Sequence, residues 1–370
     1  MKIKRILHII GKMDRAGAET MVMNLYRTID HTQFQFDFVV FSKDKGDFDE
    51  EIISIGGKIF TITEMNPIKR MLALKKLLFT HPEYRIVHCH TLFSNAFHLW
   101  AAYMAKVPNR IVHSHSTSDI SKSKLASILY KYVSRKLIKK YATNYIGCGQ
   151  AAAYFLFPEQ KEVMFLPNAI DTNYFAAIGE TKKNYINNEF DLKQDYLKII
   201  QVGRLHQVKN PLFSIQIARE LKNRGIKFLF LFIGQGELYD TMKKKIESYN
   251  LKKEVYLLGV RKDIPELMAG ADVLLMPSLY EGFPVVLVES QSVGLKGLIA
   301  DNISSEVDLG VDLIKYESIN SNTSKWVDKL LDLKLNKKIN KEERIQKMTD
   351  LGFDINGSIS LLTNLYKSMA

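Results

Sequence analysis

The segment "ADVLLMPSLYEGFPVVLVESQSVG", residues 271–294, contains the pattern that decides the fold of this chain. Residues 273–276 form a short apolar run with the length of a buried strand. A loop with Glu281 and Gly282 follows, and Pro284 suits the first position of a helix because proline has no N–H to leave unpaired there. We therefore expect a strand over 273–276 and a helix over 284–293, which together make one β–α unit.

The rest of the chain repeats this alternation of short apolar runs and helical patterns, which is typical of parallel β–α–β units. Strands are expected at 5–10, 36–40, 58–62, 85–88, 110–113, 144–148, 163–166, 197–202, 228–233 and 255–258, and helices at 17–28, 68–79, 95–105, 124–140, 211–223 and 238–249. The chain closes with an amphipathic segment, 359–370, that could pack on either half. The fold class is therefore α/β.

Length and a change of pattern indicate two domains. The 370 residues exceed the usual size of one domain, and residues 176–195 are polar and without period, which is typical of a linker. The expected domains are 1–175 and 176–350, each a doubly wound sheet, with a C-terminal helix over 351–370. Ligands of such sheets bind at the carboxyl ends of the strands, so we expect the site in a cleft between the domains.

The composition excludes several classes of protein. Cys89 and Cys148 are the only cysteines, which is too few for a disulfide framework and does not match the spacing of a metal site. The first apolar run is too short for a signal peptide, and no run approaches the ~18 residues of a membrane-spanning helix. We expect a cytoplasmic protein that does not cross a membrane.

Much of the net charge of +12 lies in one segment. Between Ile120 and Pro158 there is no acidic residue, and the basic residues there are Lys122, Lys124, Lys131, Arg135, Lys136, Lys139 and Lys140. Apolar residues from Leu125 to Leu137 recur at helical spacing, so the segment predicts an amphipathic helix. Two interpretations stay open: a core-packed helix with a solvated basic face, or a helix that binds anionic lipid or a phosphorylated partner. Nucleic acid is not expected, because no aromatic residues alternate with the basic ones.

Four histidines follow expected strands in two pairs, His88 with His90 and His113 with His115. We expect the members of each pair on opposite faces of their strand, and no carboxylate or cysteine completes a ligand set, so no metal site is predicted. Packed, hydrogen-bonded histidines are the expected alternative. His115, next to a polar loop, is the candidate for a functional role.

Two further segments have the composition of phosphate or metal sites. Gly11 and Gly17 flank a loop before a helix, which fits either contact with a phosphate or a structural turn. It is not a dinucleotide fingerprint, because G-x-G-x-x-G is absent. The triplet "DFD" at 47–49 lies in a polar stretch, and we expect a solvated loop there rather than a metal–nucleotide site.

Cations follow the first strand of the second domain. In "VGRLHQVKNP", residues 202–211, Arg204 and Lys209 leave the sheet just before a helix. Two cations beside a helix N-terminus could neutralise a diphosphate, and no acidic residue is near them in the sequence.

The two acids of the opening segment have a separation that suits a ligand with two sugar rings. Glu281 lies in the loop and Glu289 five residues into the helix, about 7.5 Å along its axis. Two acceptors at that separation can hold hydroxyl pairs on two rings of one long ligand, such as a hexose and a ribose. A core location would leave a carboxylate buried without a partner, at a cost of several kcal/mol.

Taken together, these motifs resemble the retaining glycosyltransferases of family four, and among them those that build bacterial exopolysaccharide and capsule. The resemblance spans nearly the whole chain and includes "GKMDRAGAETMVMNLYR", "IVHCHTLFSN", "RIVHSHS", "VGRLHQVKNP", "FIGQGEL" and "YEGFPVVLVES". It implies the GT-B fold, with two Rossmann-like domains facing across a cleft. Ala16 and Ala169 depart from glycines common in relatives, which leaves the acceptor geometry less defined.

The resemblance also implies roles for individual residues. His115, Glu281, Arg204 and Lys209 would be catalytic. Glu281 would contact the donor sugar, Glu289 the ribose, and Arg204 with Lys209 the diphosphate. The full set of donor-binding residues would be Gly17, Gly203, Arg204, Lys209, Arg261, Ile264, Glu281, Gly282, Phe283, Val285 and Glu289. Residues 1–175 would bind the acceptor and 176–350 the nucleotide sugar, without metal or cofactor.

The expected reaction moves a hexose or N-acetylhexosamine from a nucleotide sugar, preferably a UDP-sugar, to a lipid-linked (polyprenyl-diphosphate) saccharide, with retention of configuration. A peripheral location at the inner face of the cell membrane would suit that acceptor. The alternatives are a nucleotide-sugar epimerase of the same fold and a nucleotide-sugar-binding protein without catalysis. A nicotinamide dehydrogenase is disfavoured by the missing fingerprint.

Overall fold

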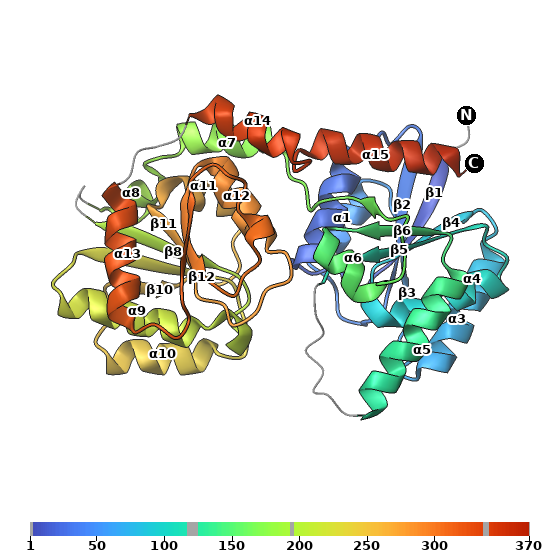
Figure 1. The fold of residues 1–370 in the computed structure, drawn as a ribbon, viewed down its shortest axis with the longest axis horizontal. Helices are drawn as coiled ribbons and strands as arrows, with labels where there is room; N and C mark the ends of the chain where they lie inside the picture. Colours follow the sequence, from blue (N-terminus) through green and yellow to red (C-terminus); the bar gives the residue numbers. More distant parts are fainter. Residues whose placement is uncertain (1–2, 117–124, 193–195, 336–339, 370) are drawn as a thin grey trace. The chain divides into compact units, whose positions relative to one another are not determined.

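The computed structural model describes residues 3–116, 125–192, 196–335 and 340–369. The chain forms two compact units (Figure 1). Unit 1 comprises residues 1–170 and 352–370, and unit 2 comprises 171–351. The boundary lies at Ile170 and Asp171 rather than after residue 175, because helix α7 (Thr172–Thr181) packs against helices α11 (Ile264–Gly270) and α12 (Val285–Val293) of unit 2.

Unit 1 has a seven-stranded parallel sheet of order β3-β2-β1-β4-β5-β6-β7. Its strands are β1 Lys4–Ile9, β2 Phe34–Val40, β3 Ile59–Thr61, β4 Ile86–Cys89, β5 Asn109–Ser114, β6 Asn144–Gly147 and β7 Met164–Phe165. Its helices are α1 Gly17–Thr28, α2 Asp49–Ser54, α3 Pro67–Thr80, α4 Asn95–Met104, α5 Leu125–Tyr141, α6 Gln150–Leu156 and α15 Ile355–Ser368. The strand order reverses between β1 and β4, and ligands of open α/β sheets bind at such a switch point.

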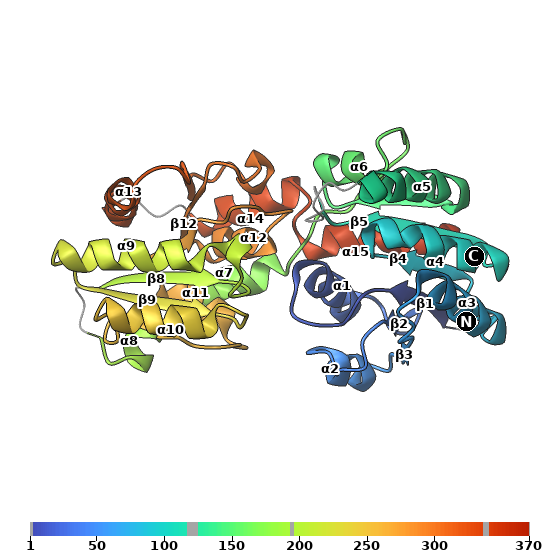
Figure 2. The ribbon, with the colours of Figure 1, turned by 90° about the horizontal axis from the view of Figure 1, so that it is seen from below.

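Unit 2 has a six-stranded parallel sheet of order β10-β9-β8-β11-β12-β13, with its switch point between β8 and β11. Its strands are β8 Leu197–Val202, β9 Phe228–Ile233, β10 Val255–Leu257, β11 Val273–Met276, β12 Lys296–Ala300 and β13 Ile314–Glu317. Its helices are α7, α8 Tyr185–Glu189, α9 Pro211–Asn223, α10 Tyr239–Ser248, α11 Ile264–Gly270, α12 Val285–Val293, α13 Thr323–Leu335 and α14 Lys341–Asp350. Figure 2 shows α9 between α10 and α13, which both contact it.

Burial on both faces explains why the central strands consist almost entirely of apolar residues. All six residues of β9 and all seven of β2 are buried. In unit 1, separate apolar clusters include residues of α1 and α15 in one case and of α3 and α4 in the other. The α/β fold class predicted from the alternation of runs is therefore confirmed.

Three local predictions are wrong. The polar stretch 176–195 is not a linker, since it contains part of α7 and all of α8, whose few apolar residues pack on unit 2. Pro284 caps α12 in an extended conformation, and the helix begins one residue later, at Val285. No element is predicted from the sequence over 295–350, where the described residues form strands β12 and β13, a 3-10 helix over Ser305–Val307, and helices α13 and α14.

The C-terminal helix α15 belongs to unit 1, where it contacts α1. Leu362 and Tyr366 of this helix are fully buried in the apolar cluster that also contains Phe34 and Phe36 of β2. Within the described residues, no helix has both the length and the apolar character that crossing a membrane requires.

Candidate active site

The chain turns sharply at the carboxyl end of β8 in unit 2. Gly203 has φ +144°, a value that side chains rarely adopt, and Gly234, after β9, has φ +137°. A Cβ on Gly234 would lie only 2.1 Å from the carbonyl oxygen of Gly203. The two backbones can approach this closely only because residue 234 is glycine, whereas Gly203 is needed for its own positive φ.

Lys209 and Glu281 form an ion pair at the switch point of unit 2. Lys209 Nζ lies 2.6 Å and 2.7 Å from the two carboxylate oxygens of Glu281. The hydroxyl of Ser278 donates to the same carboxylate at 2.6 Å. The side chain of Glu281 is only 8% exposed, whereas that of Lys209 is 25% exposed. The prediction that no acid is near Lys209 is therefore wrong, because β8 and β11 are neighbours in the sheet.

The second cation of this edge has no such partner. Arg204 is exposed, and among the described residues no hydrogen bond or ion pair of its guanidinium is found. The backbone of Lys209 is held in place by Gln201, whose Nε2 donates to the Lys209 carbonyl at 2.8 Å. The next residue, Asn210, has φ +51° and turns the chain into α9. The site therefore holds one fixed cation and one free to bind an anion.

Glu289 differs from Glu281 in its surroundings. It lies on α12, is partly buried, and within the described part of the chain its carboxyl has no hydrogen bond or ion pair. Burial raises the pKa of Glu289 from 4.5 to about 7. A partly buried carboxyl without a partner costs free energy, which makes Glu289 a candidate for a ligand contact.

The loop from Gly282 to Val285 joins these two acids. Pro284 begins the turn into α12, and no side chain caps the first N–H groups of this helix. The first backbone N–H groups of α12 are therefore candidate donors for a ligand. Phe283 itself packs on the core of unit 2, which holds the loop in place.

The guanidinium of Arg261, a predicted donor-binding residue, already has partners within the protein. Its guanidinium donates to both oxygens of Asp263, at 2.8 Å and 2.5 Å, and to Glu189 at 2.9 Å. Tyr185 also donates to Asp263 at 2.6 Å. The cation and these hydrogen bonds lower the pKa of Asp263 to about 2. Arg261 thus fixes the turn before Ile264, the first residue of α11, and its donor contact stays a prediction.

In unit 1, five histidines gather at the carboxyl ends of β1, β4 and β5. His8 lies on β1, His88 on β4, His113 on β5, and His90 and His115 just after β4 and β5. Burial lowers the pKa of all five, that of His115 to about 4. The predicted opposite orientation within each pair is wrong, because residues two apart share a face of a strand. The rings of His88 and His90 are stacked with centroids 4.3 Å apart.

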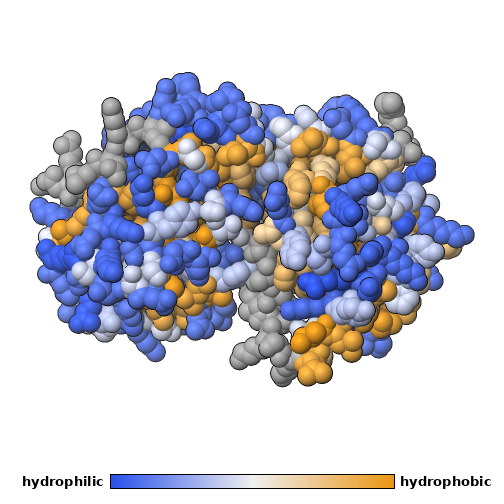
Figure 3. All heavy atoms as spheres, viewed as in Figure 1, coloured by the Kyte–Doolittle hydropathy of each residue, from blue (hydrophilic) through white to orange (hydrophobic). Residues whose placement is uncertain are grey.

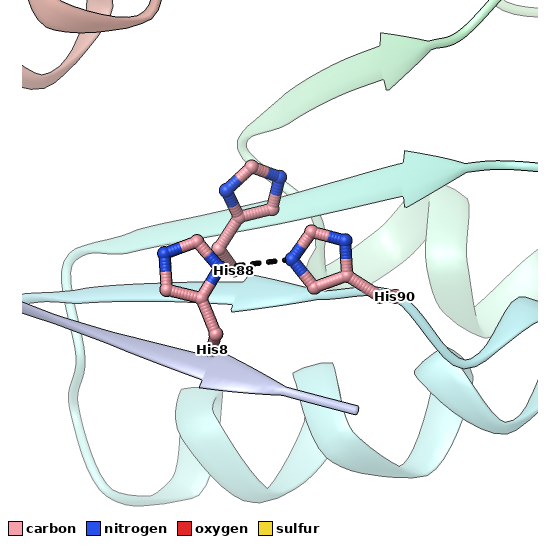
Figure 4. A group of neighbouring side chains, drawn as sticks. All are labelled: His8, His88 and His90. Atoms are coloured by element: carbon pink, nitrogen blue, oxygen red, sulfur yellow. Dashed lines mark hydrogen bonds between the residues drawn. The ribbon is translucent and has the colours of Figure 1, made fainter. Parts of the chain in front are cut away.

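Hydrogen bonds connect part of this histidine cluster. His8 Nδ1 lies 3.0 Å from His90 Nε2 (Figure 4), and His90 Nδ1 lies 2.8 Å from His115 Nε2. His88 Nδ1 lies 2.9 Å from the hydroxyl of Tyr366 on α15. Sequence reasoning missed His8 and Tyr366; the only signal for His8 was a polar residue inside the apolar run of β1.

Two sets of three histidines could ligate a metal ion, His8 with His88 and His90, and His90 with His113 and His115. In each set the potential ligand atoms lie within 4.8 Å of one another. Imidazoles suit Zn²⁺ and other first-row metals. In the present arrangement, however, two of the contacts between these rings have hydrogen-bond distances, so the geometry is that of a hydrogen-bonded row.

The "DFD" triplet is not a freely solvated loop as expected, because its side chains bond to the backbone or are buried. The carboxylates of Asp47 and Asp49 accept from the backbone N–H groups of Arg15 and Gly46, at 3.0 Å and 2.9 Å. Phe48 is 2% exposed. These bonds hold the loop before α1 in place.

Gly17 opens α1, and a Cβ built on it meets no atom within 4 Å. We expect Gly17→Ala to leave the free energy of unfolding unchanged or to raise it by at most about 1 kcal/mol, because alanine favours the helix. The midpoint of thermal unfolding should accordingly stay the same or rise. If a ligand approaches this backbone, the same methyl group lowers kcat/KM by at least about tenfold. The matched control is Gly357→Ala in α15, which has the same open space and should preserve activity. Equal activity of both variants would contradict a ligand contact at Gly17.

Two family models and several known proteins match this chain. Residues 15–174 match the family model "Glycosyltransferase Family 4", and residues 182–348 match "Glycosyl transferases group 1". EpsF of Bacillus subtilis, which is assigned as a glycosyltransferase, is 37% identical over 98% of this chain and 96% of its own length. An Escherichia coli UDP-Gal:α-D-GlcNAc-diphosphoundecaprenol α-1,3-galactosyltransferase is 27% identical over 87% of this chain and 90% of its own length.

Among solved structures, Anabaena HepE in complex with UDP and glucose has a similar fold. It superposes with a TM-score of 0.78 over 99% of this chain and 100% of its own chain, at 17% sequence identity. At that identity the likeness concerns the fold alone.

Proposed function

Because this chain belongs to family 4 of the glycosyltransferases and has their two-domain GT-B fold, we propose that it transfers a hexose or N-acetylhexosamine from a UDP-sugar to a lipid-linked saccharide in exopolysaccharide or capsule synthesis. One observation carries the proposal. The Lys209–Glu281 pair lies at the switch point of unit 2, whose residues also include Arg204 after β8 and Glu289 on α12, two side chains without an ion-pair partner among the described residues. The relative from Escherichia coli, which is named for UDP-galactose and a diphosphoundecaprenol acceptor, supports the donor and acceptor classes.

The ion pair allows a donor to exchange partners on binding. A diphosphate offers Lys209 a stronger electrostatic partner than a single carboxylate, and Arg204 adds a second cation. Once Lys209 contacts the diphosphate, Glu281 is released to accept hydrogen bonds from hydroxyls of the donor sugar. The ribose hydroxyls would bind to Glu289, where two donors meet a carboxyl that has no partner within the described residues.

The same groups stabilise the leaving diphosphate. Cleavage of the bond between sugar and phosphate builds negative charge on the diphosphate, and preorganised cations stabilise that charge most strongly in the transition state. Arg204, Lys209 and the first N–H groups of α12 supply this stabilisation without a metal ion. We infer retention of configuration, with the acceptor entering on the face that the diphosphate leaves and a phosphate oxygen taking its proton.

A lipid-linked acceptor requires access to a membrane surface, and α5 offers one. The first half of its apolar stripe is exposed, with Leu125 at 89%, Ile128 at 61% and Leu129 at 63% exposure, whereas Leu137 and Ile138 near the other end pack on the core of unit 1. Figure 3 shows apolar side chains gathered over the lower end of α5. The basic residues of the described helix are Lys131, Arg135, Lys136, Lys139 and Lys140; Lys122 and Lys124 lie outside the described residues. Exposed apolar residues beside lysines are typical of helices that bind anionic membranes, so we propose a peripheral location at the inner face of the cell membrane.

We expect vesicle binding to depend on both features of α5. Vesicles that contain anionic phospholipid should sediment with the chain, and Leu129→Asp or Lys136→Glu should each weaken this binding by several-fold, since one basic residue near an anionic surface contributes about 1 kcal/mol. Lys262→Glu, at an exposed position of unit 2, makes the same charge change elsewhere and should bind as the wild type does. Equal binding of all these variants would overturn the proposal that α5 docks on the membrane.

The proposed activity can be tested with purified chain, a diphospholipid-linked saccharide, and UDP-glucose, UDP-galactose or UDP-N-acetylglucosamine in turn, with and without a chelator. The expected result is transfer of one sugar that persists in the chelator and gives an α-linked product by NMR. Conversion of the donor without acceptor would indicate an epimerase instead. Donor binding without turnover across acceptors would indicate a binding protein.

A further inference from the structure

Three of the five clustered histidines form one continuous row across the unit 1 sheet. Going along the row, His8 Nδ1 meets His90 Nε2 at 3.0 Å, and His90 Nδ1 meets His115 Nε2 at 2.8 Å. The row crosses from β1 to the residues after β4 and β5, beside the switch point of this sheet. His90 is held at this place by its backbone N–H, which donates to the carbonyl of Ile9 at 2.9 Å.

All three rings are neutral in the folded protein. His8 and His90 are 1% and 8% exposed, and burial lowers the pKa of both and that of His115, the last to about 4. A neutral imidazole carries one proton, so one ring nitrogen donates and the other accepts.

Neutrality couples the protons of the three rings. If His8 donates from Nδ1, then Nε2 of His90 accepts, and the proton of His90 must be on Nδ1. That proton is donated to Nε2 of His115, whose own proton is then on Nδ1. The opposite choice at His8 places every proton on Nε2. The row therefore has two states, in which all three rings carry the proton on the same kind of nitrogen.

The ends of the row decide between these states. His8 Nε2 and His115 Nδ1 are buried, and among the described residues neither has a hydrogen-bond partner. One end must hold an unpaired N–H. The ring of His8 lies against Phe36 and Phe38, with centroids 4.2 Å and 5.6 Å away, where no acceptor is offered. His115 is partly exposed at the edge of the sheet. Either state leaves one N–H without a partner, and the state with every proton on Nδ1 is favoured because it places that N–H on the partly exposed His115 rather than among the aromatic rings around His8.

We propose that His8 and His90 are positioning residues that hold His115 as the Nδ1–H tautomer, so that its N–H, which is buried and has no partner among the described residues, is left to donate to an oxygen of the transferred sugar on binding. The catalytic consequence rests on the proposed function and on the catalytic role that the family resemblance implies for His115. The tautomer coupling itself needs no substrate and can be measured separately. His8 acts through two hydrogen bonds and does not touch His115.

The test uses the full chain labelled with ¹⁵N in its histidines, dialysed against a chelator, and long-range ¹H–¹⁵N correlation spectra at pH 7. We expect the Nδ1–H pattern for His8, His90 and His115 together. In His8→Leu the row loses its donor, and His115 should change to a mixture of tautomers. His8→Asn, whose amide can donate from the place of Nδ1, should restore the single tautomer. His88→Leu is the matched control, since His88 is as buried as His8 but bonds to Tyr366, and it should leave His115 unchanged.

The kinetic result should follow the spectra. His8→Leu is expected to lower kcat about tenfold with the donor KM unchanged, as for one misplaced hydrogen bond in the transition state, and His8→Asn should recover it. Mixed tautomers in the wild type, a signal that depends on bound metal, or an unchanged His115 in His8→Leu would overturn the proposal. Coupled tautomers in a chain without glycosyl transfer would instead contradict the proposed function and leave the coupled row standing.

Discussion

Glu281→Gln is expected to lower kcat/KM by about a thousandfold while UDP itself binds as tightly as before or more tightly. The carboxylate of Glu281 accepts from Lys209 at 2.6 Å and from Ser278 at 2.6 Å. An amide keeps the shape but removes the charge, so Lys209 is no longer neutralised and becomes more available to a diphosphate. The contact with the sugar hydroxyls weakens at the same time, and loss of a charged hydrogen bond that forms with the transition state costs about 3–4 kcal/mol.

A loss of turnover without a loss of UDP affinity distinguishes the proposed exchange, in which Lys209 leaves Glu281 for the diphosphate, from general damage to the site. It can be measured by calorimetric titration with UDP and by initial rates with the UDP-sugar. The control is Glu237→Gln, because Glu237 is 64% exposed and lies 3.4 Å from His206 on the adjacent turn; it should change neither quantity by more than about twofold. Parallel losses of UDP affinity and of turnover in Glu281→Gln would contradict the exchange.

Glu289→Gln is expected to stabilise the folded protein above pH 7. The pKa of Glu289 is about 7 in the folded protein, against 4.5 for the unperturbed group. Between these values the folded state binds more protons than the unfolded state, so stability falls as the pH rises through this window. The penalty is absent below the lower value and complete only about one unit above the higher one, where it amounts to on the order of 3 kcal/mol. A neutral amide removes it.

The same substitution should weaken UDP binding by about 100-fold, since two hydrogen bonds from ribose hydroxyls to a carboxylate are weakened. Thermal unfolding from pH 4.5 to pH 8.5, with and without UDP, measures both effects. The wild type should lose stability across this range relative to the variant, and UDP should raise the midpoint of the wild type only. Glu306→Gln, at an exposed position of unit 2, is the control and should follow the wild type. A variant that is less stable than the wild type at pH 8 would show that Glu289 has a structural partner instead.

The sequence predicts the β–α units well because buried parallel strands must be apolar on both faces, as in β9 and β11. It also locates Arg204, Lys209 and Glu281 at strand ends. It could not predict that Lys209 and Glu281 pair, since these residues are 72 positions apart and meet only because β8 and β11 are neighbours. Strand order is a property of tertiary packing, and local sequence patterns do not predict it.

Two other differences have similar causes. Helices α7 and α8 were not predicted, because short helices that pack through a few apolar residues show little hydrophobic periodicity in their sequence. Their stability comes from tertiary contacts. The histidine row depends on three strands lying side by side, and His8 has no partner close in sequence. Arg261 was a reasonable donor contact from its position, but its pairing with Asp263 and Glu189 depends on the fold of α8, which the sequence did not reveal.

The central claim, that the strand ends of unit 2 bind a nucleotide through its diphosphate, is tested most directly by calorimetric titration of UDP and UMP into the wild type and Arg204→Gln. Arg204 is exposed, and within the described residues its guanidinium has no partner, so its substitution should leave stability unchanged. We predict that the wild type binds UDP more tightly than UMP, and that Arg204→Gln loses at least about tenfold in UDP affinity but little in UMP affinity. No saturable binding of UDP, or equal UDP affinity of the two proteins, would contradict the account.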